Sequence, residues 1–188
     1  YPECLTEADI GEQNTSECFH CNEGYNQICT NLPSNVTLEE NSICFIQSNI
    51  DILQTFIESS MSTLDINIMD LDSSNVIDWF ELGIQNWSNG NLQSLKVNNL
   101  QLSGGIPDSI GALTNLITLH LHENQLSGQI PQSICDLTLD WEADSTNESQ
   151  SYIFNNQLCT DPATDEWPSC IEDYVGTQNT DNCPTGSE

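Results

Sequence analysis

Apolar residues recur at matching positions in two consecutive stretches of the chain. The first stretch reads SLKVNNLQLSGGIPDSI from Ser94, and the second reads TLHLHENQLSGQIPQSI from Thr118, 24 positions later by subtraction. Each stretch opens with apolar residues that alternate with polar ones, which predicts a short strand with one buried face. Glycine and proline follow in both and predict a tight bend. A repeat of this length indicates units that stack side by side and share an apolar core.

Weaker matches to the same pattern flank the two clear copies. Residues 62–71, STLDINIMDL, align with the start of the first copy and predict a degenerate first strand. Residues 151–158, SYIFNNQL, align with the second copy and predict a strand over residues 151–154, after an acidic insertion. Apolar residues at helical spacing predict an amphipathic capping helix over residues 46–58.

The ending LSGxIP, which both copies share, resembles that of the plant-type leucine-rich repeats. This family occurs in receptor ectodomains, polygalacturonase inhibitors and secreted bacterial proteins, including marine ones. The close resemblance covers residues 92–139. It implies an α/β solenoid, a short right-handed coil of about four strands with disulfide-bonded N- and C-terminal caps.

The sequence pattern also divides the chain into parts. Residues 1–18 read YPECLTEADIGEQNTSEC and repeat residues 167–183, WPSCIEDYVGTQNTDNC, so the chain opens with a copy of its own C-terminal cap. The remaining parts are a cysteine-containing N-terminal cap with the helix (19–63), a degenerate repeat (64–91), the clear repeats (92–139), and a last repeat with its cap (140–188).

Charge and cysteine content limit the environment and the partners. The chain has one Lys or Arg against 29 Asp and Glu, a formal net charge of −28. Such a chain repels nucleic acids and anionic lipid surfaces, and no apolar run is long enough for membrane insertion. Nine cysteines in 188 residues predict an oxidised extracellular protein, secreted or at the cell surface. The acidity itself fits either solubility in salt water or calcium binding.

A calcium site has a local candidate in DLDSSNVIDWFE, residues 70–81. The stretch fits the template of an EF-hand loop, with Asn75 at the position of the usual glycine. The predicted ligands are Asp70, Asp72, Ser74, Val76, Asp78 and Glu81. The alternative is that these side chains are solvated turn and helix N-cap residues.

Alternation along successive strands should bring certain side chains into rows on the open face of the sheet. One row holds Asp65, Lys96, His120 and Tyr152, and the other holds Asn67, Asn98, His122 and Phe154. The two histidines could chelate zinc or copper, but a tight site needs further protein ligands. We therefore interpret them as exposed members of a binding face.

The cysteines and the N-x-S/T sequences predict covalent modifications. Disulfides are expected between Cys4 and Cys18, Cys21 and Cys44, Cys135 and Cys159, and Cys170 and Cys183, which leaves Cys29 to pair outside the chain or to stay free. A bridge from Cys135 to Cys159 would clamp the acidic insertion between them. Candidate glycosylation sites are Asn14, Asn35, Asn86 and Asn147.

Two classes of function remain. The sequence contains no nucleophile elbow, zinc-protease motif or glycine-rich phosphate loop, so we expect no enzymatic activity. The first hypothesis is an extracellular structural or assembly module, a head-to-tail unit of a surface fibre, adhesin or tandem array that binds copies of itself or other extracellular proteins. The alternative is a recognition module that binds a protein or a glycan through the strand face.

Overall fold

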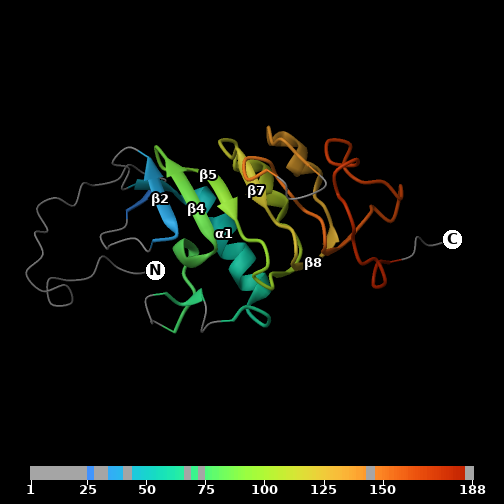
Figure 1. Ribbon diagram of the computed structural model, residues 1–188, viewed down its shortest axis with the longest axis horizontal. Coiled ribbons are helices and arrows are strands. Elements are labelled where there is room, and N and C mark those ends of the chain that lie inside the picture. Colours follow the sequence, from blue (N-terminus) through green and yellow to red (C-terminus); the bar gives the residue numbers. More distant parts are fainter. Residues whose placement is uncertain are drawn as a thin grey trace, which may run out of the picture.

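The described part of the chain folds into one α-helix, three sheets and three short 3₁₀ helices (Figure 1). A computed structural model describes residues 25–27, 34–39, 44–65, 69–71, 75–142 and 147–184. In chain order the elements are β1 (Tyr25–Gln27), β2 (Val36–Glu39), β3 (Cys44–Ile46), α1 (Gln47–Ser60), η2 (Trp79–Glu81), β4 (Ile84–Ser88), β5 (Asn91–Lys96), β6 (Ser103–Gly104), η3 (Asp108–Ala112), β7 (Thr118–His120), β8 (Gln125–Gln129), η4 (Gln132–Asp136) and β9 (Gln157–Cys159).

The strands pair in both directions. β1 and β3 form an antiparallel pair, the second sheet has the mixed order β2-β4-β5-β7, and the third sheet, β6-β8-β9, is parallel. In the second sheet β4 and β5 are an antiparallel hairpin, to which β2 and β7 add in parallel on either side. The hairpin turns at Asn89 and Gly90, whose φ angles are 49° and 77°. A two-residue turn of this kind needs such positive angles, which Asn and Gly adopt most readily.

The predicted α/β solenoid is wrong. A solenoid of this kind requires every strand to run parallel to the one before it, whereas the β4–β5 hairpin reverses the chain inside the second sheet. The described residues form a mixed α/β domain instead. The degenerate strand predicted at residues 62–71 lies in part outside the described residues and stays a prediction; residues 62–65 and 69–71, which are described, are not in a strand. Downstream, residues 151 and 152 form single bridges, and the strand forms later, as β9.

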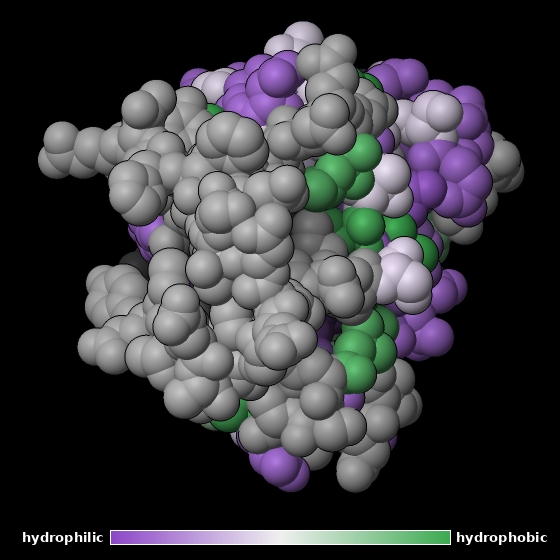
Figure 2. All heavy atoms as spheres, turned by 90° about the vertical axis from the view of Figure 1, so that its left-hand side faces the viewer, coloured by the Kyte–Doolittle hydropathy of each residue, from purple (hydrophilic) through white to green (hydrophobic). Residues whose placement is uncertain are grey.

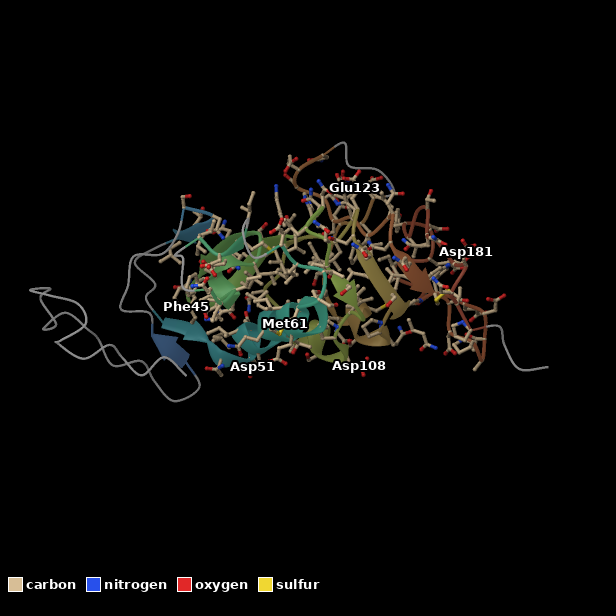
Figure 3. The ribbon with its side chains drawn as sticks, turned by 90° about the horizontal axis from the view of Figure 1, so that it is seen from below. Phe45, Asp51, Met61, Asp108, Glu123 and Asp181 are labelled. Atoms are coloured by element: carbon tan, nitrogen blue, oxygen red, sulfur yellow. A yellow bond between two sulfur atoms is a disulfide. The ribbon has the colours of Figure 1, made fainter. Side chains whose placement is uncertain are left out.

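The helix predicted for residues 46–58 is present as α1. Its buried face includes Ile50, Leu53 and Ile57, which recur at the spacing of a single helix face. Asp51 and Met61 lie on the outer side (Figure 3). None of the described helices has the length and apolar character needed to cross a membrane.

The two clear repeats lie side by side. β5 and β7 pair in parallel so that Leu95 stands opposite Leu119, its equivalent in the next repeat. The return limbs also meet, because Ser133 Oγ donates to Asp108 O at 2.6 Å. A Cβ on Gly111 would lie 2.5 Å from Ser133 O, so a larger residue would force the limbs apart.

Three amide side chains, which we call the amide row, connect successive segments of the C-terminal half: Asn124, Asn156 and Gln178. Each amide nitrogen donates to a carbonyl of its own segment and of the preceding one, and each amide oxygen accepts from an N–H of the preceding segment. For Asn156, Nδ2 lies 2.9 Å from both Leu121 O and Ile153 O, and Oδ1 lies 3.0 Å from Leu126 N. These bonds satisfy backbone groups where the chain bends and no strand partner is available.

Residues 167–183, which we call the closing segment, cover the far edge of this stack. Gln178 forms a bridge with Asn156, and two disulfides attach the segment, Cys135 to Cys170 and Cys159 to Cys183, with Cα separations of 5.5 and 5.6 Å. Sulfur atoms are visible beside Asp181 in Figure 3.

The predicted pairings of Cys135 with Cys159 and of Cys170 with Cys183 are therefore wrong. Cys135 lies in η4 and Cys159 ends β9, and the closing segment contacts both elements, so each of its cysteines meets a different one. The structure does not test the other two predicted disulfides, Cys4 with Cys18 and Cys21 with Cys44, because the side chains of these cysteines lie outside the described residues. Cys29 lies outside them as well.

We expect Asn156→Ala to lower the free energy of unfolding by about 3 kcal/mol, because it leaves a buried N–H and buried carbonyls without a partner at about 1–3 kcal/mol each. The matched control is Asn115→Ala, whose amide makes an exposed bond to Asn91 and should change stability by less than about 0.5 kcal/mol. Urea unfolding measures both variants. Equal losses of unfolding free energy in the two variants would mean that a buried amide of the amide row stabilises the fold no more than an exposed one.

Candidate functional site

The residues predicted to form an exposed binding face are largely buried. His120, His122 and Tyr152 are 3%, 5% and 1% exposed. Lys96, Asn98, Phe154 and Asp65 are half-buried, and Asn67 lies outside the described residues. The prediction that the two histidines are surface residues is therefore wrong.

The buried side chains form a cluster of rings. β5 and β7 place Lys96 opposite His120, and a parallel bridge places Tyr152 on the other side of His120. The ring centroids of His120 and Tyr152 are 4.9 Å apart, and those of His122 and Phe154 are 4.8 Å apart in a stacked arrangement. The two histidine rings are 5.5 Å apart. Strand alternation turns all four rings to the same face, where they pack on one another.

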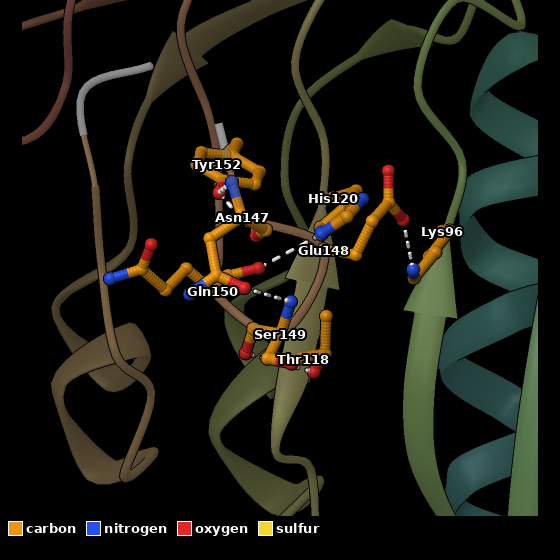
Figure 4. Close-up of polar contacts among 8 residues, drawn as sticks. All are labelled: Lys96, Thr118, His120, Asn147, Glu148, Ser149, Gln150 and Tyr152. Carbon is orange, nitrogen blue, oxygen red and sulfur yellow. Dashed lines mark hydrogen bonds and ion pairs between the residues drawn. The ribbon is translucent and has the colours of Figure 1, made fainter. Parts of the chain in front are cut away.

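Residues 147–150, which we call the strap, lie over this cluster (Figure 4). His120 Nε2 is 2.8 Å from Gln150 O, and Lys96 makes an ion pair with Glu148. Tyr152 Oη donates to Asn147 O and accepts from Asn147 N–H. A longer bond of 3.3 Å joins Thr118 Oγ1 to Ser149 O. The strap is therefore attached to the face at each of its four residues.

The sequence predicted the acidic insertion that contains Glu148 and Gln150. It did not predict that these residues lie over the ring cluster. The usable signal was the composition. Lys96 is the one Lys or Arg in the chain, so a carboxylate in the insertion had a single cationic side chain to pair with.

The electrostatics of the site favour neutral histidines. Burial lowers the pKa of His120 and the pKa of His122 below the usual 6.5, and Lys96 lowers the pKa of His120 further. The hydrogen bond with Gln150 O and the nearby carboxylates of Glu148 and Glu123 oppose this without reversing it. Nδ1 of His122 is buried without a hydrogen-bond partner, so a proton added there would find no acceptor. The hydrogen bond from Lys96 lowers the pKa of Glu148.

The EF-hand-like loop has part of the expected geometry. The N–H of Asn75 donates to Asp70 Oδ2 at 2.8 Å, and Asn75 has a φ of 65°, the left-handed conformation that the glycine position of the template requires. The buried Glu81 carboxylate accepts hydrogen bonds from the N–H groups of Leu71 and Asp78 at 2.6 and 2.9 Å, which ties the two ends of the loop together.

The ligand set of this loop is seen only in part. Asp72 and Ser74 lie outside the described residues, Val76 is exposed, and Asp78 caps η2. Among the described residues, no group of three or more His, Cys, Asp or Glu is arranged to hold a metal ion. Calcium at this loop stays a prediction.

The candidate glycosylation sites differ in their surroundings. Asn147 is exposed on the strap, whereas Asn35 Nδ2 donates to Phe80 O and Gly83 O at 2.9 and 2.6 Å. Asn86 is half-buried in β4, and Asn14 lies outside the described residues. A glycan on Asn35 would disturb two hydrogen bonds that one on Asn147 would leave intact.

Comparison with known proteins assigns no family. No protein-family model matches the chain, and no curated protein matches it significantly. The function has to be inferred from the geometry described above.

If calcium binds the loop, it should stabilise the folded chain by mass action, by about 2.7 kcal/mol at a free concentration about 100 times the dissociation constant. We expect the melting temperature to rise with calcium and to fall again with a chelator. Glu81→Gln removes the charge of the predicted bidentate ligand and should reduce this calcium-dependent rise, whereas Glu172→Gln, an exposed change in the closing segment, should leave it unchanged. A full response in Glu81→Gln would rule the loop out as the site.

Proposed function

We propose that this chain is a non-enzymatic extracellular module that joins head to tail with modules of the same kind. The observation that supports this most is the set of contacts made by the closing segment. It covers the edge of the stack through Gln178 and through two disulfides to earlier elements. A segment built in this way belongs at the junction between one module and the next.

The residues that make these contacts recur at the start of the chain. Cys170, Gly176, Gln178 and Cys183 are matched by Cys4, Gly11, Gln13 and Cys18. In the closing segment each has a structural role: the two cysteines form the disulfides, Gly176 has a φ of 59°, and Gln178 supplies the amide. Residues 1–18 lie outside the described residues, so the parallel rests on sequence alone.

The disulfide pattern extends the parallel to a second module. The cysteines of the closing segment pair with partners 35 and 24 residues earlier. By analogy, Cys4 and Cys18 pair with cysteines of another module, because Cys135 and Cys159 of this module are already bonded to Cys170 and Cys183. This arrangement replaces the predicted Cys4–Cys18 bridge, because the equivalent cysteines of the closing segment, Cys170 and Cys183, are not bonded to each other. The repeating unit is about 165 residues (183 − 18).

The environment and the opposite end of the molecule fit this proposal. The two disulfides are compatible with an extracellular protein, and we propose that the chain is secreted or displayed at the cell surface. Where described residues can be seen from the end that faces away from the closing segment, they include both apolar and hydrophilic ones (Figure 2). Repeated contacts between unlike ends produce an open array when the rotation from one module to the next does not close a ring.

Recognition through an open strand face, the alternative function, has less support. The strap covers that face, and three of its predicted members are buried. A protein or glycan could reach them only after the strap had moved. Family membership among the leucine-rich repeats rests on the LSGxIP resemblance and is likewise a proposal.

Disulfide mapping of the oxidised chain tests the assembly proposal. Without a preceding module, Cys4 and Cys18 lack their partners. In a Cys29→Ser background, which removes the other cysteine without a partner in the chain, we therefore expect disulfide-linked oligomers that disappear when Cys4→Ser/Cys18→Ser is added. In native material the same two cysteines should be bonded to a different module. A monodisperse chain with a Cys4–Cys18 bridge, or native material without links between modules, would contradict the proposal.

A further inference from the structure

The closing segment buries seven side chains wholly or in part, and each has an equivalent of the same kind in residues 1–18. Ile171 is fully buried and Val175 is 8% exposed, and these two align with Leu5 and Ile10. The whole set consists of Trp167, Pro168, Cys170, Ile171, Val175, Gln178 and Cys183, which align in order with Tyr1, Pro2, Cys4, Leu5, Ile10, Gln13 and Cys18.

The exposed positions of the closing segment mostly differ between the two copies. Residues 172–174 are all exposed, and the one additional residue of the N-terminal copy falls there, where residues 6–9 take their place. Exposed side chains also change at Ser169, Thr177, Asp181 and Asn182, which align with Glu3, Glu12, Ser16 and Glu17. Substitutions at exposed positions change stability little. The N-terminal copy therefore keeps the side chains that would face a docking surface.

The surface that receives the closing segment, which we call the stack edge, consists of η4 and residues 153–159. Gln178 Nε2 donates to Ile153 O at 3.1 Å, and Gln178 Oε1 accepts from Leu158 N–H at 3.3 Å. Two further hydrogen bonds join main-chain atoms of the two parts, at 2.6 and 2.8 Å between nitrogen and oxygen. The main-chain bonds are open to any sequence, whereas the other two need a carboxamide side chain.

We infer that residues 1–18 dock on the stack edge of another copy of this module, with Cys4 bonded to the equivalent of Cys135 and Cys18 to the equivalent of Cys159. This inference rests on the proposed head-to-tail function, to which it adds the docking surface and the order of the disulfides. The apolar side chains and the carboxamide of residues 1–18 then occupy the sites that their equivalents fill in the closing segment.

The direction in which the segment crosses the stack edge decides the pairing. In the closing segment the first cysteine meets η4, the second meets the end of β9, and Gln178 lies between them. Gln13 likewise lies between Cys4 and Cys18, and both glutamines precede the second cysteine by five positions (18 − 13 and 183 − 178). The reverse pairing would turn the segment around and remove the carboxamide from the backbone groups that it satisfies.

A graft in the full chain tests this inference. Residues 167–183 are replaced by the sequence of residues 1–18, while the original N-terminal copy carries Cys4→Ser and Cys18→Ser and the chain carries Cys29→Ser. The parent for comparison has the same three substitutions and its own closing segment. We expect the graft to melt within about 4 °C of the parent. Proteolysis and mass spectrometry should find the first grafted cysteine bonded to Cys135 and the second to Cys159.

Two substitutions inside the graft form a matched pair. Gln13→Ala leaves Leu158 N–H and Ile153 O without their partner and should lower the melting temperature of the graft by at least about 4 °C. Glu12→Ala changes the neighbouring position, whose equivalent Thr177 is exposed, and should lower it by less than about 2 °C. Equal losses in the two variants would overturn docking through the carboxamide.

The remaining outcomes separate this inference from the assembly proposal. A graft that does not fold, or that forms its disulfides in the reverse order or between its own two cysteines, would overturn the inference. A graft of scrambled sequence with its cysteines in place should melt lower and form mixed pairings, and equal performance would overturn the inference as well. In native material, Cys4 bonded to the equivalent of Cys159 would overturn the inference and leave head-to-tail assembly standing, whereas material without links between modules would contradict the assembly itself.

Discussion

The C-terminal half of this protein depends on satisfying backbone hydrogen bonds where the chain bends between stacked segments. A parallel stack brings peptide groups close together at its bends, away from water, and an unpaired group there is costly. Asn124, Asn156 and Gln178 satisfy these backbone groups at successive bends. In each of them the amide nitrogen donates to backbone carbonyls and the amide oxygen accepts from a backbone N–H. A carboxamide suits the position because it both donates and accepts.

The amide row also sets the register of the side chains on the neighbouring strands. Once successive segments are locked level with one another, Lys96 must stand beside His120 and His120 beside Tyr152. The ring cluster is a consequence of this register. The strap then uses the hydrogen-bonding groups that the cluster leaves at its surface, and Gln150 O contacts the buried ring of His120.

The N-terminal half is held together by a hairpin and a core of aromatic rings. There the chain reverses through the β4–β5 hairpin, and the rings of Phe45, Trp79 and Trp87 pack at centroid distances between 5.0 and 5.4 Å. Gln85 again serves as a buried amide, donating to Trp79 O and Leu82 O and accepting from the Trp87 indole. An aromatic core of this kind does not depend on a sequence repeat, which explains why the repeat pattern failed to extend into this half.

The sequence by itself determined the features that depend on local pattern. Helical spacing predicted α1, alternation predicted the buried leucines of β5 and β7, and the repeat predicted which residues would be neighbours across them. Three features were decided only by the tertiary structure: the mixed sheet, the crossed disulfides and the burial of His120 and His122. Each depends on which distant segment comes to lie against a residue. A hairpin between two short strands competes with parallel stacking at little cost in loop entropy, because its turn is only two residues long. Cysteine spacing does not reveal whether η4 or β9 meets a given part of the closing segment. A strand face is open or covered according to where a connecting loop packs, and no alternation pattern along the strand records that.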